Sequence, residues 1–160
     1  MSHAEILIPW HPVEGLTFSF IGAEVWSDYP RLCLRLIDGR ADVHEQRDLC
    51  VVFRRAPAYT VHEEFVHPTQ GTVFGREPTI GSGSQHTCPL LTVEGSPWFA
   101  ALADELELTG GKHVHYRFCT AFPVADVAAA EPPEVYWLQR SAPAEDAPLP
   151  GWAGGASGAL

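Results

Sequence analysis

The stretch Lys112–Ala130 constrains the fold of this chain more than any other, because its first half alternates with a period of two. Val114, Tyr116 and Phe118 fall on one face of an extended chain, and the polar side chains between them fall on the other: His113, His115, Arg117 and Cys119. This alternation is typical of a half-buried β-strand. A second apolar run, Phe122–Ala129, follows after a short turn. The stretch therefore predicts a hairpin or meander within a sheet.

Similar apolar or alternating runs recur along the whole chain and predict further strands. They occupy residues 5–10, 16–26, 31–37, 49–53, 58–65, 72–74, 90–93 and 134–138. Leu49–Phe53 is apolar throughout, which is typical of a central strand covered on both sides. Pro9 places the first strand at an edge, because proline cannot donate a hydrogen bond to a neighbouring strand.

One helix is predicted between Ser96 and Gly110. Ser96 is suited to cap its N-terminus, Pro97 is suited to its first position, and Gly110-Gly111 ends it. Apolar side chains recur between these points at helical spacing: Trp98, Phe99, Leu102 and Leu106. We expect this stripe to cover one sheet face and to enclose a core with Val114, Tyr116, Phe118, Phe122, Val124 and Val127.

These elements predict an α+β fold that is mainly β. We expect a single domain over residues 1–138, with a twisted antiparallel sheet of about six to eight strands packed against one α-helix. Residues 139–160 are rich in Ala, Pro and Gly and are expected to form a C-terminal tail.

Charge and composition narrow the classes of function. The chain of 160 residues carries 20 acidic and 10 basic side chains, a formal net charge of −10. Such a surface repels nucleic acid and anionic membranes and attracts a basic partner. No stretch approaches the ~18 apolar residues of a spanning helix, and the N-terminus does not resemble a secretory signal. We expect a cytoplasmic protein whose four cysteines are reduced and mostly buried.

Two motifs resemble catalytic signatures without matching them. His62–His67 (HEEFVH) has one residue more than the zinc-protease pattern H-E-x-x-H, so its two imidazoles would not face one metal on a helix. Gly81–Ser84 (GSGS) lacks both the nucleophile-elbow pattern and the lysine of a phosphate-binding loop. We therefore interpret the Gly-rich region as a flexible loop that is suited to binding.

His113 and His115 are candidate metal ligands. Two positions apart on a strand, their imidazoles share one face. A third ligand would have to come from elsewhere in the chain, with His62, Glu64 and Cys119 as candidates. The alternative interpretation is a polar strip that faces solvent beside Arg117.

The motifs of residues 30–130 give a resemblance to a group of known proteins. The chain resembles small β-rich bacterial proteins of unassigned function, some of which are immunity proteins encoded beside polymorphic or contact-dependent toxins. The residues that carry the resemblance are an L-x-L-x-L strand ending in Asp38-Gly39, then Phe53, Ala56, Tyr59, Val61 and Glu63, then Lys112, His113 and Tyr116, and finally Asp126–Ala128.

The resemblance implies stoichiometric binding of a toxin domain with a basic surface, rather than catalysis, and no cofactor. The contact surface would combine the Gly71–Gly95 loop with these side chains: Glu45, Asp48, Glu63, Glu64 and His86. One alternative is a metal-binding domain or metal-dependent enzyme that uses His113 and His115. Another is a ligand-binding module with a pocket between the helix and the sheet.

Overall fold

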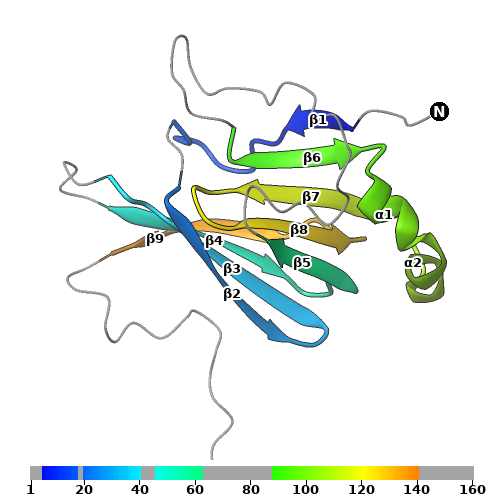
Figure 1. Ribbon diagram of the computed structural model, residues 1–160. Helices are drawn as coiled ribbons and strands as arrows, with labels where there is room; N and C mark the ends of the chain where they lie inside the picture. Colours follow the sequence, from blue (N-terminus) through cyan, green and yellow to red (C-terminus); the bar gives the residue numbers. More distant parts are fainter. Residues whose placement is uncertain (1–4, 18–19, 41–45, 63–87, 141–160) are drawn as a thin grey trace, which may run out of the picture.

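Two antiparallel β-sheets pack face to face in the computed structural model, which describes residues 5–17, 20–40, 46–62 and 88–140 (Figure 1). The five-stranded sheet has the order β1-β6-β7-β8-β5. Its strands are β1 (Ile6–Pro9), β5 (Ala58–His62), β6 (Leu90–Glu94), β7 (Val114–Cys119) and β8 (Val124–Ala129). The four-stranded sheet has the order β2-β3-β4-β9. Its strands are β2 (Gly22–Asp28), β3 (Arg31–Ile37), β4 (Arg47–Phe53) and β9 (Glu134–Gln139).

The core lies between the two sheets and follows from the alternation of the strands. Each strand turns every second side chain inward, so Leu34 on β3, Val51 on β4 and Phe118 on β7 are fully buried in one cluster. Aromatic rings join the sheets: the Phe53 ring lies 6.1 Å from that of Phe118 in an edge-to-face arrangement. β4 lies between β3 and β9 and is buried along almost its whole length, as its apolar run predicted.

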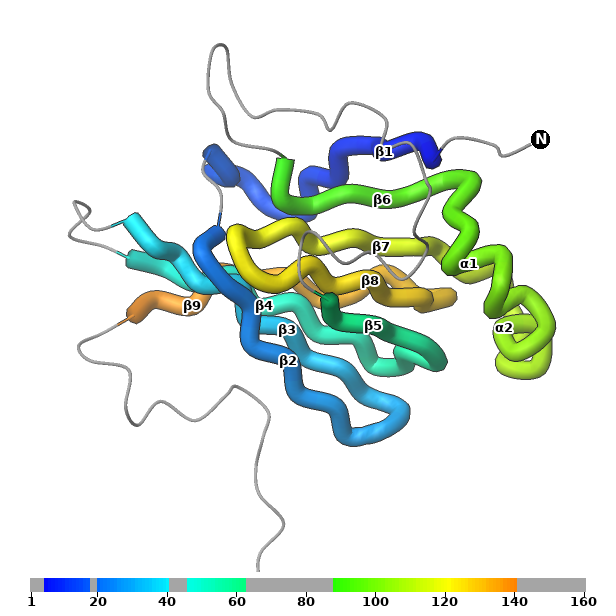
Figure 2. The backbone as a smooth tube through the Cα atoms, viewed as in Figure 1, coloured from blue at the N-terminus to red at the C-terminus, as the bar shows by residue number. Residues whose placement is uncertain are grey.

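The chain crosses between the sheets repeatedly, which fixes the two layers to each other. Residues 54–57 carry it from β4 to β5, and residues 130–133 carry it from β8 to β9 (Figure 2). A parallel bridge between Phe20 and Thr120 adds a backbone contact outside the named strands. At these two points consecutive strands belong to different sheets, so short connections join the two sheets covalently.

Two short helices replace the one that was predicted. α1 (Pro97–Ala101) begins at the expected cap, and α2 (Ala103–Thr109) ends at Gly110, whose φ is 73°. Leu102 separates them with a non-helical backbone. Both helices lie at one end of the five-stranded sheet (Figure 1).

The Ser96 cap is expected to contribute measurably to stability. Its hydroxyl accepts a hydrogen bond from the Phe99 N–H at 3.3 Å, and the side chain is buried. Replacing Ser96 by alanine should lower the free energy of unfolding by about 1 kcal/mol, measured by urea denaturation. Ser27→Ala, on an exposed part of β2, is the matched control. An unchanged Ser96→Ala protein would show that the cap does not stabilise α1.

The fold class is confirmed in its main part and corrected in its detail. The chain is mainly β, but its strands form two sheets rather than one, and the second sheet covers the core where a helix was expected. Phe122, predicted to be in the core, is 61% exposed. β9 ends at Gln139, and Arg140 donates a hydrogen bond to Asp48. Residues 72–74 and 141–160 lie outside the described residues.

Candidate functional site

A cluster of charged side chains is buried on the outer face of the five-stranded sheet, the face turned away from the core. We call it the Asp126 cluster, and it consists of Glu5, His62, His115, Arg117 and Asp126. The strand register explains it, because Arg117 on β7 and Thr60 on β5 both lie opposite Asp126 on β8. The period of two then brings His115 and His62 to the same face.

Asp126 is fully buried and is the acceptor that holds the cluster together. Arg117 Nε donates to its Oδ1 at 2.7 Å. His115 Nε2 lies 2.6 Å from the same oxygen, and His62 Nε2 lies 2.9 Å from Oδ2. Burial alone would raise the pKa of Asp126, but hydrogen bonds from His115 and His62 and the charge of Arg117 hold it well below its usual range. Asp126 is therefore a carboxylate in the folded protein.

Glu5 gives the cluster a second carboxylate, on the residue before β1. Its Oε2 accepts from Arg117 Nη1 at 2.9 Å and its Oε1 accepts from Nη2 at 3.4 Å. Burial opposes the charge of Arg117, but the two carboxylates outweigh it and raise the pKa of the guanidinium. Two carboxylates thus share one guanidinium, and a proton on either imidazole would make the cluster neutral.

The two ring nitrogens of His115 differ in their contacts. Nε2 lies against Asp126 Oδ1, while Nδ1 is buried and has no hydrogen-bond partner among the described residues. The rings of Trp98 and Phe99 lie 4.9 and 5.8 Å from the imidazole. A His–Asp pair of this kind can act as a base, but the ring is only 2% exposed. The Asp126 cluster is therefore best explained as a structural network.

The two histidines proposed as metal ligands have different partners. His113 Nε2 lies 2.9 Å from Thr109 Oγ1, whereas His115 is bound to Asp126. Among the proposed third ligands, His62 does join His115 on one carboxylate, and Cys119 lies in a small apolar cluster with Cys88 and Leu91. Glu64 lies outside the described residues. Within the described ranges, no group of three His, Cys, Asp or Glu side chains could hold a metal ion.

The interpretation of this strip as solvent-facing is wrong for His115 and Arg117. Both point away from the core but are buried, whereas His113 is half-buried. The signal that was missed is Asp126, a single carboxylate within the apolar run 122–129. A buried charge requires a partner, so this residue could have indicated that the polar face of the preceding strand is covered.

Asp48 is also buried, although it was expected to be an exposed acid that contacts a partner. On β4 it accepts hydrogen bonds from Arg35 Nε at 2.7 Å and from Arg140 Nη2 at 2.6 Å. Its Oδ1 also accepts from the backbone N–H of Asp38 at 3.0 Å. Asp48 has no surface exposed to solvent, so it cannot contact a partner in this structure. The other predicted contact residues lie outside the described residues: Glu45, Glu63, Glu64 and His86.

Three of the four cysteines are buried, as predicted. Burial, with the nearby Cys33 thiol as a second cause, raises the pKa of Cys50 to about 11. Burial likewise raises the pKa of Tyr136, its neighbour on β9, to about 12. A thiol with such a pKa is almost wholly protonated at neutral pH and is a poor nucleophile.

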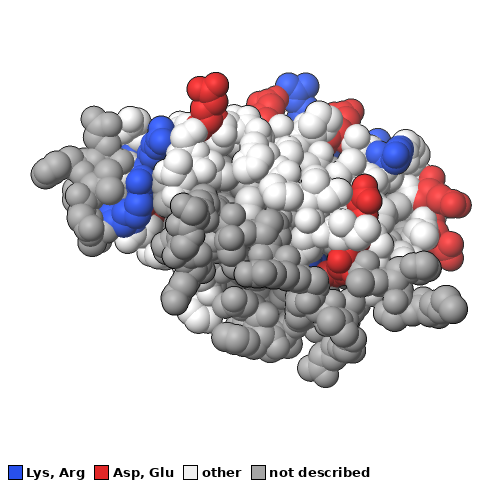
Figure 3. Space-filling view, turned by 90° about the horizontal axis from the view of Figure 1, so that it is seen from above, with Lys and Arg blue, Asp and Glu red and all other residues white. Residues whose placement is uncertain are grey.

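Exposed acids gather where α2 lies, at one end of the molecule (Figure 3). Asp104, Glu105 and Glu107 are exposed, and no ion pair engages them within the described part of the chain. Leu108, beside them, is 89% exposed. α2 therefore presents three carboxylates and an apolar side chain to solvent.

Comparison with protein-family models, with curated proteins and with solved structures finds no match to this chain. Among the described residues, neither helix has the length and the apolar composition needed to cross a membrane.

Proposed function

We propose that this chain is a non-catalytic binding protein, an immunity protein that neutralises a cognate toxin domain by stoichiometric binding. The observation that carries the proposal is the exposed surface of α2, where Asp104, Glu105 and Glu107 lie beside Leu108. Carboxylates around an exposed apolar side chain suit a basic protein partner, because charge steers the encounter and apolar contact adds affinity.

The distribution of basic side chains supports this proposal. Most described arginines are engaged by acids of the same chain: Arg35, Arg40, Arg54, Arg117 and Arg140. Their charges are cancelled within the fold, so the exposed carboxylates of the described residues, those of α2 among them, are left to attract a partner. A basic toxin domain would be attracted to such a surface at long range.

The chemistry of the described side chains favours binding over catalysis. Asp126 is held by three donors, and the Cys50 thiol is protonated at neutral pH. These groups stabilise the fold in the arrangement observed, whereas the acids of α2 are exposed and form no ion pair with another described residue.

The test is co-purification with the product of the neighbouring gene, followed by titration of the purified pair. The double variant Glu105→Gln/Glu107→Gln should weaken the complex about tenfold, mainly through slower association. Glu14→Gln/Asp28→Asn removes two exposed charges elsewhere and should change the dissociation constant less than about threefold.

Two outcomes count against the proposal. The absence of a complex at micromolar concentration would contradict the function itself. Equal weakening by the two double variants would contradict the assignment of the contact surface to α2, because only the overall charge would then matter.

The alternative proposal is a metal-binding domain or metal-dependent enzyme that uses His113 and His115. The unpartnered Nδ1 of His115 favours it, because a buried imidazole nitrogen with a free lone pair is able to bind a metal. Elemental analysis of the purified protein tests it. Zinc, iron and nickel all well below one equivalent per chain would remove this alternative.

A further inference from the structure

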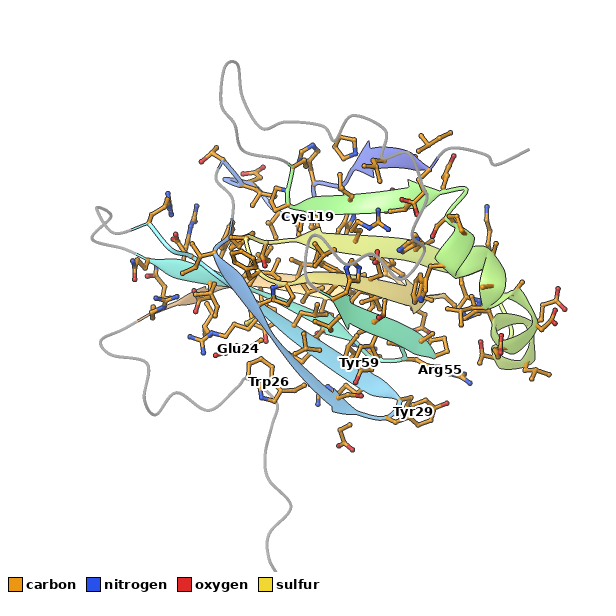
Figure 4. The ribbon with its side chains drawn as sticks, in the orientation of Figure 1. Glu24, Trp26, Tyr29, Arg55, Tyr59 and Cys119 are labelled. Carbon is orange, nitrogen blue, oxygen red and sulfur yellow. The ribbon has the colours of Figure 1, made fainter. Side chains whose placement is uncertain are left out.

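A cavity of about 230 Å³ lies beside the C-terminal end of α2. Three segments far apart in sequence form its walls: the α2–β7 connection, the β4–β5 connection and the β8–β9 connection. Its lining residues are Arg55, Pro57, Thr109, Gly110, Gly111, His113, Ala130 and Glu131. Arg55 lies at the end of the molecule where the helices are (Figure 4). The cavity is smaller than those that hold drug-sized ligands, so it suits a small metabolite.

Opposite charges line this cavity without neutralising each other. Arg55 and Glu131 are both exposed, and no ion pair joins them to each other or to another described residue. The preceding residue, Arg54, differs, because it donates to Glu134, the first residue of β9, at 3.0 Å. That bond and, to a lesser degree, the charge of Glu131 raise the pKa of Arg54. One guanidinium and one carboxylate therefore remain available at the cavity.

Thr109, His113 and Gly111 form another part of the cavity wall. Thr109 donates its hydroxyl to the Leu106 carbonyl at 2.8 Å, so its oxygen accepts from His113 Nε2. That bond places a proton on His113 Nε2. Gly111 has a φ of 85°, and a Cβ there would meet the Ala130 Cβ at 3.4 Å. The positive φ favours glycine at this position of the wall.

We propose that the cavity binds a small zwitterion, a free α-amino acid or a molecule with the same two groups. Arg55 pairs with the carboxylate, for which a guanidinium offers two parallel donors. Glu131 pairs with the ammonium group. A plain anion would be repelled by Glu131 and a plain cation by Arg55, so the lining selects for both charges on one small molecule. This site is independent of the proposed binding of a toxin.

The test is an NMR titration of the ¹⁵N-labelled full chain with L-alanine, L-glutamine and L-leucine. We expect saturable shifts of the Gly110, Gly111 and His113 amides with a dissociation constant of about 0.1–5 mM for at least one probe. N-acetyl and amide derivatives of that probe each lack one charge and should bind at least tenfold more weakly.

Matched variants assign the charges. Arg55→Gln and Glu131→Gln should each weaken binding of the same probe at least tenfold, whereas Arg54→Gln and Glu134→Gln should change it less than twofold. Both lining residues are exposed, so their variants are expected to fold. If they did not, the singly charged derivatives on the unaltered protein would still decide the matter.

The proposal is overturned if none of the three amino acids shifts these amides in a saturable way up to 50 mM. It is equally overturned if the acetylated or amidated derivative binds as well as the parent, because the site would then recognise one charge only.

Discussion

Replacing Asp126 by asparagine is expected to lower the free energy of unfolding by about 3–5 kcal/mol. Asparagine keeps the shape of the side chain but replaces the carboxylate that Arg117, His62 and His115 share. Removing one partner of a buried ion pair leaves the other charge uncompensated, and this penalty exceeds the loss of the bonds themselves. Glu5 remains beside Arg117 and limits the loss of stability. Its hydrogen bonds within the cluster go to Arg117 and not to His62 or His115, so it does not replace Asp126 there.

Urea denaturation at pH 7 measures this effect. Asp28→Asn is the matched control, because Asp28 is an exposed aspartate at the end of β2 and its replacement should change the free energy of unfolding by less than about 1 kcal/mol. A loss below 1 kcal/mol for Asp126→Asn would show that the Asp126 cluster is not a structural network. It would instead favour a role in chemistry for the His115–Asp126 pair.

The same carboxylate makes the stability depend on pH. The pKa of Asp126 in the folded protein lies below the value of about 3.9 for an exposed aspartate. Its contribution is therefore complete above the unfolded-state pKa and is lost as the pH falls from about 4 towards the folded-state value. Asp38 acts in the same direction, since hydrogen bonds from Arg40 outweigh burial and lower its pKa. Asp126→Asn should thus flatten, without abolishing, the decline in stability below pH 4.

Replacing Asp48 by asparagine is expected to lower the free energy of unfolding by about 3 kcal/mol, near the lower end of the range for buried pairs. Asp48 is fully buried and receives Arg35 from β3 and Arg140 from the residue after β9. It also accepts the Asp38 backbone N–H, and asparagine has only one acceptor oxygen, so its NH2 group would face either that N–H or Arg35. The loss is smaller than at Asp126 because Arg35 and Arg140 keep some access to water, with side chains 12% and 23% exposed.

Glu24→Gln is the matched control for Asp48→Asn. Glu24 pairs with the same Arg35 at 3.4 Å, but its side chain is 45% exposed, so its replacement should change stability by less than about 1 kcal/mol. Similar effects of the two replacements in thermal and urea unfolding would contradict the structural role of Asp48. If Asp48→Asn also weakened binding to a partner, the unfolding data would show that lost stability is the cause.

Local patterns of the sequence were sufficient to predict the strand and the helix ends near the candidate site. The alternation of residues 113–119 predicted β7 and placed Tyr116 and Phe118 in the core, where they lie. Ser96-Pro97 predicted the start of α1, and Gly110 predicted the end of α2. These features succeed because caps, turns and the period of a strand depend on residues close together in the chain.

The way in which the elements assemble could not be predicted in the same way. An apolar strand face must be covered, but its pattern does not specify whether a helix or a second sheet covers it. The polar face of β7 looked suited to solvent, because nothing near His115 in sequence indicates that Asp126 and His62 meet it. The same applies to Asp48, whose partner Arg140 lies 92 positions away.

By itself, the sequence determined that this protein is mainly β, which strands alternate, where the helical segment begins and ends, and that acids exceed bases. Only the tertiary structure decided that two sheets enclose the core, that Asp126 and Asp48 are buried, and that Arg55 and Glu131 line one cavity. The physical reason is that strand propensity and charge are local or additive properties. Burial and ion pairing instead depend on which distant segments meet.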